Sequence, residues 1–302
     1  MTRPARAARK VRALAAGLVA FSALGCVGGE ARADEPVTPV TPLRHDLRVD
    51  LPVTAGLAVA TVGFRLVRDD LEPSSCRWCD GSSPGEVNAV DGWFRTALRR
   101  HDPYPANVAS YVLAFGAAPV SAIAFTALAT VSDGRGSEVL VDLLAVAEGG
   151  FSAMLTTEIL ESVTLRTRPY VHAIASDQAR AEVLAQTGAF HSFPAGHVVE
   201  AFGVASAAGV VASMRGYRLA PLVWAAGLMV GVATAYTRIA SDRHYFTDVL
   251  AGAAIGTVVG GGVPLLFHRP IDPDATASWL QRARLVAAPL PRGQMMGLGG
   301  TF

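Results

Sequence analysis

Charged residues are scarce in this chain of 302 residues. They make up 17% of the sequence, whereas hydrophobic residues make up 51% and the mean hydropathy is +0.35. Soluble domains carry about 25% charged residues, so this composition excludes an ordinary soluble domain. Lysine is rarer still, because Lys10 is the only one. Outside residues 3–12 there is no long basic run, which argues against nucleic acid as a partner.

Residues 1–33 have the pattern of an export signal. Basic residues crowd positions 3–12, an apolar core follows at 14–24, and a small-x-small cleavage site ends at Ala33. Cys26 leaves a lipoprotein signal as an alternative, although alanine stands three residues before it, where leucine is usual. We therefore expect an exported protein.

Beyond the signal the chain has two cysteines, Cys76 and Cys79, in Cys-Arg-Trp-Cys. A zinc site would need a second pair of ligands, and a redox motif would need a thioredoxin-like strand and helix, which the neighbouring sequence does not supply. An oxidising compartment favours a disulfide. We therefore predict a structural disulfide between these two residues and no bound metal.

Long apolar runs dominate the chain after residue 106. A membrane-spanning helix needs about 20 apolar residues, with a range of about 17–25. Four runs meet this requirement with few or no charges: residues 107–131, 198–214, 219–236 and 249–267. The sequence thus predicts an all-α fold, a helical bundle of about five to six core helices embedded in a membrane. A wholly periplasmic helical bundle is the alternative.

A further helix is expected over residues 138–165, although this stretch carries acids. The acids are Asp142, Glu148, Glu158 and Glu161. Because acids at membrane depth face a bundle interior or a polar cavity, this helix should be the least exposed to lipid.

The sequence divides into four parts. They are the signal at 1–33, an N-terminal segment at 34–106, a helical domain at 107–267 and a C-terminal tail at 268–302. The N-terminal segment contains the cysteine pair and an apolar run at 51–67, which is short, is interrupted by Arg65 and is predicted to be an interfacial helix. The tail is rich in proline, glycine and arginine, so we expect it to be disordered or loosely attached.

The number of crossings gives an orientation for the bundle. The site of an exported enzyme should face outward, which places the segments near Arg168 and His244 outside and the links at 132–136 and 214–218 inside. Both links carry arginine, as the positive-inside rule prefers. The scheme requires that residues 51–67 do not cross the membrane. It predicts a cell-membrane protein with an outward-facing site.

Three polar fragments lie at the seams between the predicted helices. They are Arg168-Pro169, the segment Pro194 to His197, and an Arg-x5-His-x3-Asp segment from Arg238 to Asp248. His244 and Asp248 are four residues apart, so on a helix the carboxylate could hold one ring nitrogen while the other faces a substrate. Each fragment alone is also compatible with an ordinary helix cap or turn.

In this order the three fragments resemble the motifs of the type 2 phosphatidic acid phosphatase and haloperoxidase superfamily. The resemblance covers residues 137–267. It implies a phosphatase that passes through a phosphohistidine, with His244 as the nucleophile, Asp248 fixing its tautomer and His197 as the general acid. It also implies a set of phosphate-binding groups, which are the side chains of Arg168 and Arg238 and the backbone amides of Ala195 and Gly196.

Two positions depart from the family's pattern. Glu161 stands where members usually have lysine, seven residues before Arg168, and Ala195 stands where they usually have serine. Seven residues is about two helical turns, so Glu161 should share a helix face with Arg168. Without that lysine a bound phosphate would lose a charge-assisted hydrogen bond, and such a loss costs about 1.5–3 kcal/mol. Glu161 is therefore an atypical site position that would weaken phosphate binding.

Two functional hypotheses of different class follow. The first is a metal-independent hydrolase, without a cofactor, that acts on a lipid phosphomonoester or an isoprenoid diphosphate. The alternative is a degenerate, weakly active or inactive family member in which Glu161 pairs with Arg168 and the bundle binds a lipid or a protein. A vanadate-dependent haloperoxidase is disfavoured, because the Glu161 carboxylate should not lie among the cationic side chains that would bind vanadate. The expected partners are a membrane and a phosphorylated lipid.

Overall fold

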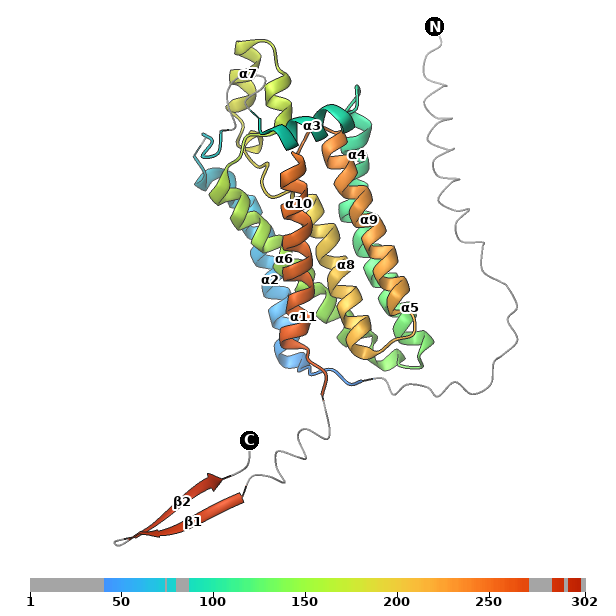
Figure 1. Ribbon diagram of the computed structural model, residues 1–302, viewed down its shortest axis with the longest axis vertical. Helices are drawn as coiled ribbons and strands as arrows, with labels where there is room; N and C mark the ends of the chain where they lie inside the picture. Colours follow the sequence, from blue (N-terminus) through green and yellow to red (C-terminus); the bar gives the residue numbers. More distant parts are fainter. Residues whose placement is uncertain (1–40, 74, 80–86, 272–283, 291–292, 300–302) are drawn as a thin grey trace, which may run out of the picture. The chain divides into compact units, whose positions relative to one another are not determined.

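The computed structural model describes residues 41–73, 75–79, 87–271, 284–290 and 293–299, and the structural statements that follow concern these residues. The predicted signal at 1–33 and Cys26 lie outside them. Long helices lie side by side in one bundle (Figure 1). The predicted all-α fold class is therefore confirmed for the bundle.

Six long helical segments form the bundle in the described part of the chain. They are α2 (Leu47–Leu71), α4 (Tyr104–Val112) continued by η2 (Leu113–Ala117) and α5 (Ala118–Ser132), α6 (Val139–Thr164), α8 (Gly196–Arg215), α9 (Ala220–Ala240), and α10 (Phe246–Ile255) continued by η6 (Gly256–Gly260) and α11 (Gly261–Phe267). Shorter elements connect them: α3 (Ala89–Leu98), η3 (Gly136–Glu138), η4 (Pro169–Ala173), α7 (Asp177–Leu184) and η5 (Thr187–Ala189). The π-helical turns η2 and η6 keep the flanking helices in one continuous segment.

Helix α8 is the centre of the bundle, and most of its side chains are buried. Helices α5, α6 and α9 and the α10–α11 segment pack around it (Figure 1). Small residues allow this close packing. A Cβ atom on Gly260 would lie 2.3 Å from the carbonyl oxygen of Gly203, and such small residues are typical of helix contacts within membranes. This packing fixes the N-terminus of α8, which carries His197, at one end of the bundle.

All six long segments are long and apolar enough to cross a membrane. Large apolar side chains also cover the outside of the bundle, for example Leu66 at 76%, Val59 at 72% and Val258 at 71% exposure. Soluble proteins rarely expose so much contiguous apolar surface. The chain is therefore a membrane protein, and the wholly periplasmic bundle loses its support.

The prediction for residues 51–67 was wrong in length. They belong to α2, which has 25 residues and qualifies as a membrane span. Arg65 does not interrupt the helix, because its Nη1 lies 3.6 Å from Oε1 of Glu158 on α6. A charge that looked like the end of an apolar run is thus compensated by the neighbouring helix.

This added span changes the membrane orientation. Arg68, near the C-terminal end of α2, lines the same cavity as Arg168. At the other end of the bundle the N–H of Arg44 donates to the carbonyl of Arg269 at 2.9 Å. The described residues that flank the six candidate spans, 41–46 and 268–271, therefore lie at the end of the bundle opposite the cavity. A cleaved export signal would deliver the start of α2 to the outer side, so a cleaved signal and an outward-facing site cannot both hold.

We expect the cavity end to face outward. The Cys76–Cys79 disulfide lies at this end, and disulfides are typical of oxidising compartments. In intact cells carrying a Cys26→Ser background, a membrane-impermeant maleimide should label Ala181→Cys in α7 and leave Ser137→Cys, in the link at the opposite end, unlabelled. Labelling of Ser137→Cys but not of Ala181→Cys would place the cavity on the cytoplasmic side.

The acids of α6 are buried in the bundle, as predicted, but α6 is not the least exposed helix, because α8 is more deeply buried. Asp142 pairs with the buried Arg215 at 2.7 Å, and Glu148 lies 2.8 Å from Nε2 of His268. The contact with His268 ties the first residue of the predicted tail to α6. The two acids nearer the other end of α6 line the cavity described next.

The C-terminal tail contains structure that was not predicted. Its first residues are attached to the bundle, since the N–H of Ile271 donates to the carbonyl of Pro42 at 2.8 Å. Further along, β1 (Arg284–Leu290) and β2 (Gly293–Gly299) form an antiparallel hairpin in which Arg284 pairs with Gly299. The prediction of a loosely attached tail is thus wrong for its first residues.

Candidate active site

A cavity of about 150 Å³ opens at the end of the bundle where the three sequence fragments meet. Its wall contains Arg168, Gly196, His197, Arg238 and His244, together with Arg65, Arg68, Tyr111, Phe115, Met154, Thr157, Glu158, Glu161, Gly188 and His191. The fold thus brings one or more residues of every fragment to a single hollow. Ala195 and Asp248 lie behind its wall, fully buried.

The His244 ring has a defined orientation. Its Nδ1 lies 2.7 Å from the carbonyl oxygen of Ser192, which can only accept a hydrogen bond, so Nδ1 carries the proton. Its Nε2 therefore has a lone pair, which accepts a hydrogen bond from Nη1 of Arg168 at 3.2 Å at the cavity wall. Burial, with Arg238 and Arg168 nearby, holds the pKa of His244 well below its usual value. The ring is thus a neutral imidazole with its nucleophilic nitrogen at the cavity.

Asp248 was expected to hold the His244 ring directly, and the structure differs. Its carboxylate accepts hydrogen bonds from Oγ of Ser192 at 2.6 Å and from the N–H of Tyr245 at 2.8 Å. The four-residue spacing does not produce a direct contact because His244 lies in the turn before α10 and not on the helix. Asp248 is therefore linked to His244 through Ser192, whose side chain donates to the carboxylate and whose carbonyl accepts the hydrogen bond from Nδ1–H of His244.

Arg168 and Arg238 bring two guanidinium groups to the cavity. Arg168 is held by the carbonyl of Gly188, to which its Nε donates at 2.8 Å. Arg238 is held from α4, where Oγ of Ser110 accepts from its Nη1 at 2.8 Å. The Nε of Arg238 is buried and has no partner among the described residues. Both side chains are therefore fixed while keeping N–H groups for an anion.

His197 stands against two aromatic rings of the α4–η2 segment. Its ring centroid lies 4.5 Å from that of Tyr111 and 4.9 Å from that of Phe115, both in edge-on contacts. Its Nε2 is buried and has no hydrogen-bond partner among the described residues. The ring is thus held by packing, and this nitrogen is left for a bound substrate.

The two amides expected to bind phosphate have different surroundings. The N–H of Ala195 donates to the carbonyl of Asp248 at 3.1 Å, so it is not available to a ligand and that prediction was wrong. Gly196, the first residue of α8, lines the cavity. Its amide lies at a helix N-terminus, which attracts anions.

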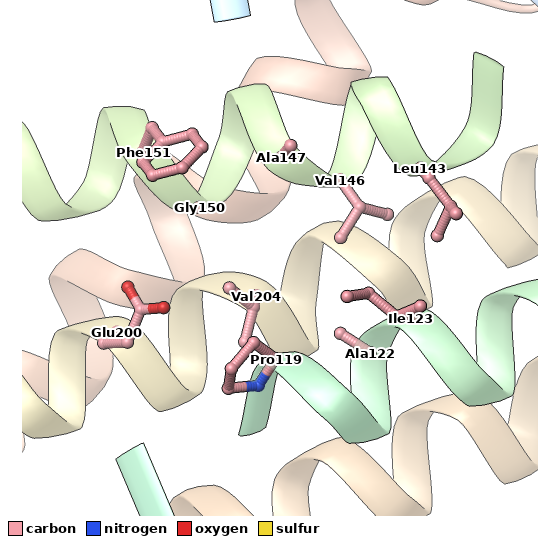
Figure 2. Close-up of a pocket in the computed structure, with 10 residues that line it drawn as sticks. All are labelled: Pro119, Ala122, Ile123, Leu143, Val146, Ala147, Gly150, Phe151, Glu200 and Val204. Carbon is pink, nitrogen blue, oxygen red and sulfur yellow. The ribbon is translucent and has the colours of Figure 1, made fainter. Parts of the chain in front are cut away.

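A second, apolar cavity of about 370 Å³ lies between α5, α6 and α8 (Figure 2). Its wall contains Pro119, Ala122, Ile123, Leu143, Val146, Ala147, Gly150, Phe151, Glu200 and Val204. Glu200 is one helical turn from His197, and Pro119 is about one turn from Phe115. The apolar cavity therefore begins about one helical turn from residues that line the polar one. Glu200 is the one acidic residue among those that line this cavity (Figure 2).

Arg166 supports the site, although no sequence motif singled it out. It is fully buried, and it pairs with Asp248 at 2.6 Å and with Asp91 of α3 at 2.9 Å. Its guanidinium also lies 4.2 Å from the ring centroids of Trp78 and Tyr245. The Arg-x-Arg spacing before Pro169 was visible, but the sequence did not show which distant carboxylates would meet it.

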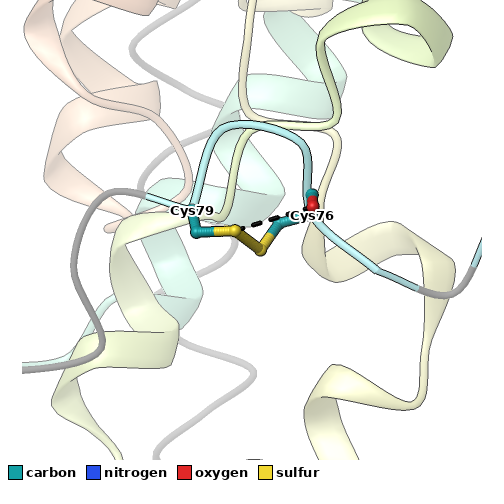
Figure 3. The surroundings of a disulfide bond; sticks show 2 residues. All are labelled: Cys76 and Cys79. Carbon is teal, nitrogen blue, oxygen red and sulfur yellow. Dashed lines mark hydrogen bonds between the residues drawn. A yellow bond between two sulfur atoms is a disulfide. The ribbon is translucent and has the colours of Figure 1, made fainter.

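The disulfide between Cys76 and Cys79 closes the loop that carries Trp78 (Figure 3). This loop runs beside the first motif, since the N–H of Thr167 donates to the carbonyl of Trp78 at 3.1 Å. The Trp78 ring also lies 5.5 Å from the ring of Phe193 in the second motif. The disulfide thus restrains the loop that places the Trp78 ring beside the first and second motifs.

We expect Arg166→Met to destabilise the protein by about 3–5 kcal/mol, because it leaves two buried carboxylates without their cation. Thermal unfolding of the purified protein measures the effect. Arg100→Met is the matched control, since Arg100 is exposed, and it should change stability by less than about 0.5 kcal/mol. A loss below about 1 kcal/mol for Arg166→Met would show that the Asp91 and Asp248 carboxylates find other partners.

Two groups of potential metal ligands are present among the described residues, although the sequence showed no cluster. They are Asp50, Glu148 and His268, and Asp69, Glu72 and His191, with ligand atoms within 4.8 Å of one another. In the second group, near the polar cavity, Nε of Arg68 lies 3.9 Å from Asp69. A guanidinium there opposes binding of a divalent cation.

Residues 142–272 match the model of the PAP2 superfamily. This segment of the chain is therefore similar to that superfamily, and the resemblance drawn from the three motifs is confirmed. The match begins within α6 and ends after α11. Helices α2 to α5 lie outside it.

Two individual proteins are similar to parts of this chain. A stretch of 72 residues is 38% identical to the lipid A 1-phosphatase of Porphyromonas gingivalis, and it covers 24% of this chain and 15% of that protein. The transmembrane PAP2 type phosphatidylglycerolphosphate phosphatase from Bacillus subtilis has a similar structure over 72% of this chain and 94% of that chain, with 16% sequence identity and a TM-score of 0.41.

Proposed function

We propose that this protein is a phosphatase that removes phosphate from a membrane lipid through a phosphohistidine on His244. The observation that carries the proposal is the Nε2 lone pair of His244, which faces a cavity containing Arg168 and Arg238. Phosphoryl transfer needs a positioned nucleophile and cations around the phosphate oxygens. The cavity supplies both.

The reaction has two steps. In the first, Nε2 of His244 forms a bond to phosphorus, the bond from phosphorus to the lipid oxygen breaks, and His197 donates a proton to that oxygen. In the second, His197 accepts a proton from water, the water oxygen bonds to phosphorus, and the bond between phosphorus and Nε2 breaks. His197 thus serves as acid and then as base. The two arginines neutralise the phosphate oxygens throughout.

The apolar cavity supports a lipid as the substrate. It lies along the helices that carry His197 and Phe115, within a bundle whose outer surface is apolar. A phosphate in the polar cavity would place the attached alkyl chain toward this apolar space. The degenerate alternative predicted an ion pair between Glu161 and Arg168, whereas the ion pair of Glu161 is with Arg68.

Phosphate release by the purified protein in mixed micelles tests the proposal. We expect release from at least one of phosphatidate, phosphatidylglycerol phosphate, lipid A and an isoprenoid diphosphate. Glycerol 3-phosphate, which has the same phosphomonoester without a tail, should react far more slowly. Equal rates with glycerol 3-phosphate would refute the lipid assignment, and no release from any substrate would refute the phosphatase.

A further inference from the structure

Glu161 is a carboxylate at the wall of a cavity that should bind an anion. Its Oε1 is close to the N-terminus of α8, since a Cβ atom on Gly196 would lie 3.2 Å from it. Alone, it would repel a phosphate bound by Arg168. The structure shows that Glu161 is not alone.

Arg68 approaches Glu161 from α2, 93 residues earlier in the chain. Its Nη1 donates to Oε2 of Glu161 at 2.9 Å and to Oε2 of Glu158. Among the described residues neither Nη2 nor Nε of Arg68 donates a hydrogen bond to a side chain or backbone oxygen. The two carboxylates therefore hold the guanidinium by one nitrogen, and its other N–H groups are left for another acceptor.

The charges around the polar cavity favour an anion only because of α2. Four arginines and two glutamates line this cavity, and two of the arginines, Arg65 and Arg68, come from α2. Without them the formal charges of the wall would cancel. With them the cavity has a net positive charge, which attracts a dianionic phosphomonoester.

We propose that Arg68 binds the substrate phosphate and that Glu161 and Glu158 are positioning residues that hold its guanidinium at the cavity. This inference rests on the proposed function. The cation that the first motif lacks is then supplied by α2, a helix outside the segment that matches the superfamily model. Glu161 supports that cation, which explains a carboxylate at this position.

Steady-state assays of the full-length protein with a lipid phosphate test the inference. Arg68→Gln should lower kcat/KM by about tenfold to a hundredfold through loss of a charge-assisted hydrogen bond. Glu161→Lys alone should also lower it, because it replaces the acceptor of Arg68 by a like charge. The exchange Arg68→Glu with Glu161→Lys restores a cation held by a carboxylate. The kcat/KM of this double variant should be at least about tenfold higher than that of Arg68→Glu alone or of Glu161→Lys alone.

Arg48→Gln is the matched control, because this exposed arginine lies at the other end of α2. It should leave kcat/KM unchanged. Where Arg68→Gln fails to fold, Arg68→Gln with Glu161→Gln removes one charge of each sign, and it should show the same loss. Lower kcat/KM for Arg48→Gln as well would indicate a general effect of α2 and overturn the specific role of Arg68.

Binding of inorganic phosphate separates this inference from the proposed function. If Arg68→Gln retains the wild-type kcat/KM and phosphate affinity, the inference fails while the phosphatase stands. If the wild type hydrolyses no lipid phosphate, the proposed phosphatase activity is refuted, and the role of Arg68 is then tested by binding of inorganic phosphate alone. In that case at least about tenfold weaker binding by Arg68→Gln supports the inference. Equal binding, or no binding by the wild type, overturns it.

Discussion

Replacing His244 by alanine is expected to reduce lipid phosphate hydrolysis by about a thousandfold or more, to the background rate. The reason is that Nε2 of His244 is the ring nitrogen that carries a lone pair, and it lies beside Arg168, one of the two arginines that would hold the phosphate. Without it no phosphoenzyme can form. Initial rates of phosphate release, measured at saturating lipid, determine the effect.

Trapping the phosphoenzyme makes this test specific. With a substrate labelled at phosphorus, acid-labile label should appear on the wild-type protein and be absent from His244→Ala. His45→Ala is the matched control, because this exposed histidine lies at the end of the bundle opposite the cavity, and it should retain both label and activity. Turnover by His244→Ala within tenfold of the wild type would exclude this histidine as the nucleophile.

Replacing His197 by phenylalanine is expected to lower kcat/KM for a lipid phosphate by about 10²–10⁴-fold, the usual contribution of a general acid or base. Phenylalanine keeps an aromatic ring against Tyr111 and Phe115, so packing is conserved while the proton donor is lost. An alkoxide leaving group needs that proton. The expected loss therefore depends on the leaving group.

A pair of substrates tests that dependence. The loss in His197→Phe should be much smaller with 4-nitrophenyl phosphate, because nitrophenolate leaves without a proton. Phosphoenzyme should then accumulate, since hydrolysis of the intermediate still lacks its base. Equal losses with both substrates and no accumulation would assign His197 to phosphate binding instead of proton transfer.

The helical fold was predictable because it depends on local properties of the sequence. Apolar runs of membrane-spanning length specify helices directly, and the acids of α6 indicated its burial. The prediction failed at α2, where the short apolar run interrupted by Arg65 was taken as an interfacial helix and not as a helix long enough to span a membrane. The partner that permits this charge, Glu158, lies 93 residues later, and no local pattern indicates such a contact.

The site was predictable in its residues and only partly in its contacts. The three fragments supplied Arg168, His197, Arg238 and His244, which all line one cavity. The partner of His244 was missed. It is the backbone carbonyl of Ser192, and a backbone group has no signature in the sequence. The four-residue spacing predicted a direct contact between His244 and Asp248 because both were assumed to lie on one helix. That helix, α10, begins at Phe246, two residues after His244.

The sequence by itself determined the membrane character of this chain, its resemblance to the superfamily and most of the residues that line the candidate site. These features follow from the composition and from motifs whose residues are close together in the sequence, so they can be read without a structure. Only the tertiary structure decided that Glu161 meets Arg68, that Arg166 joins two buried carboxylates, and that the start of α2 and the end of α11 lie at the end of the bundle opposite the cavity. Ion pairs between residues far apart in the chain depend on how helices pack, and helix packing is a property of surfaces that become adjacent only when the chain folds.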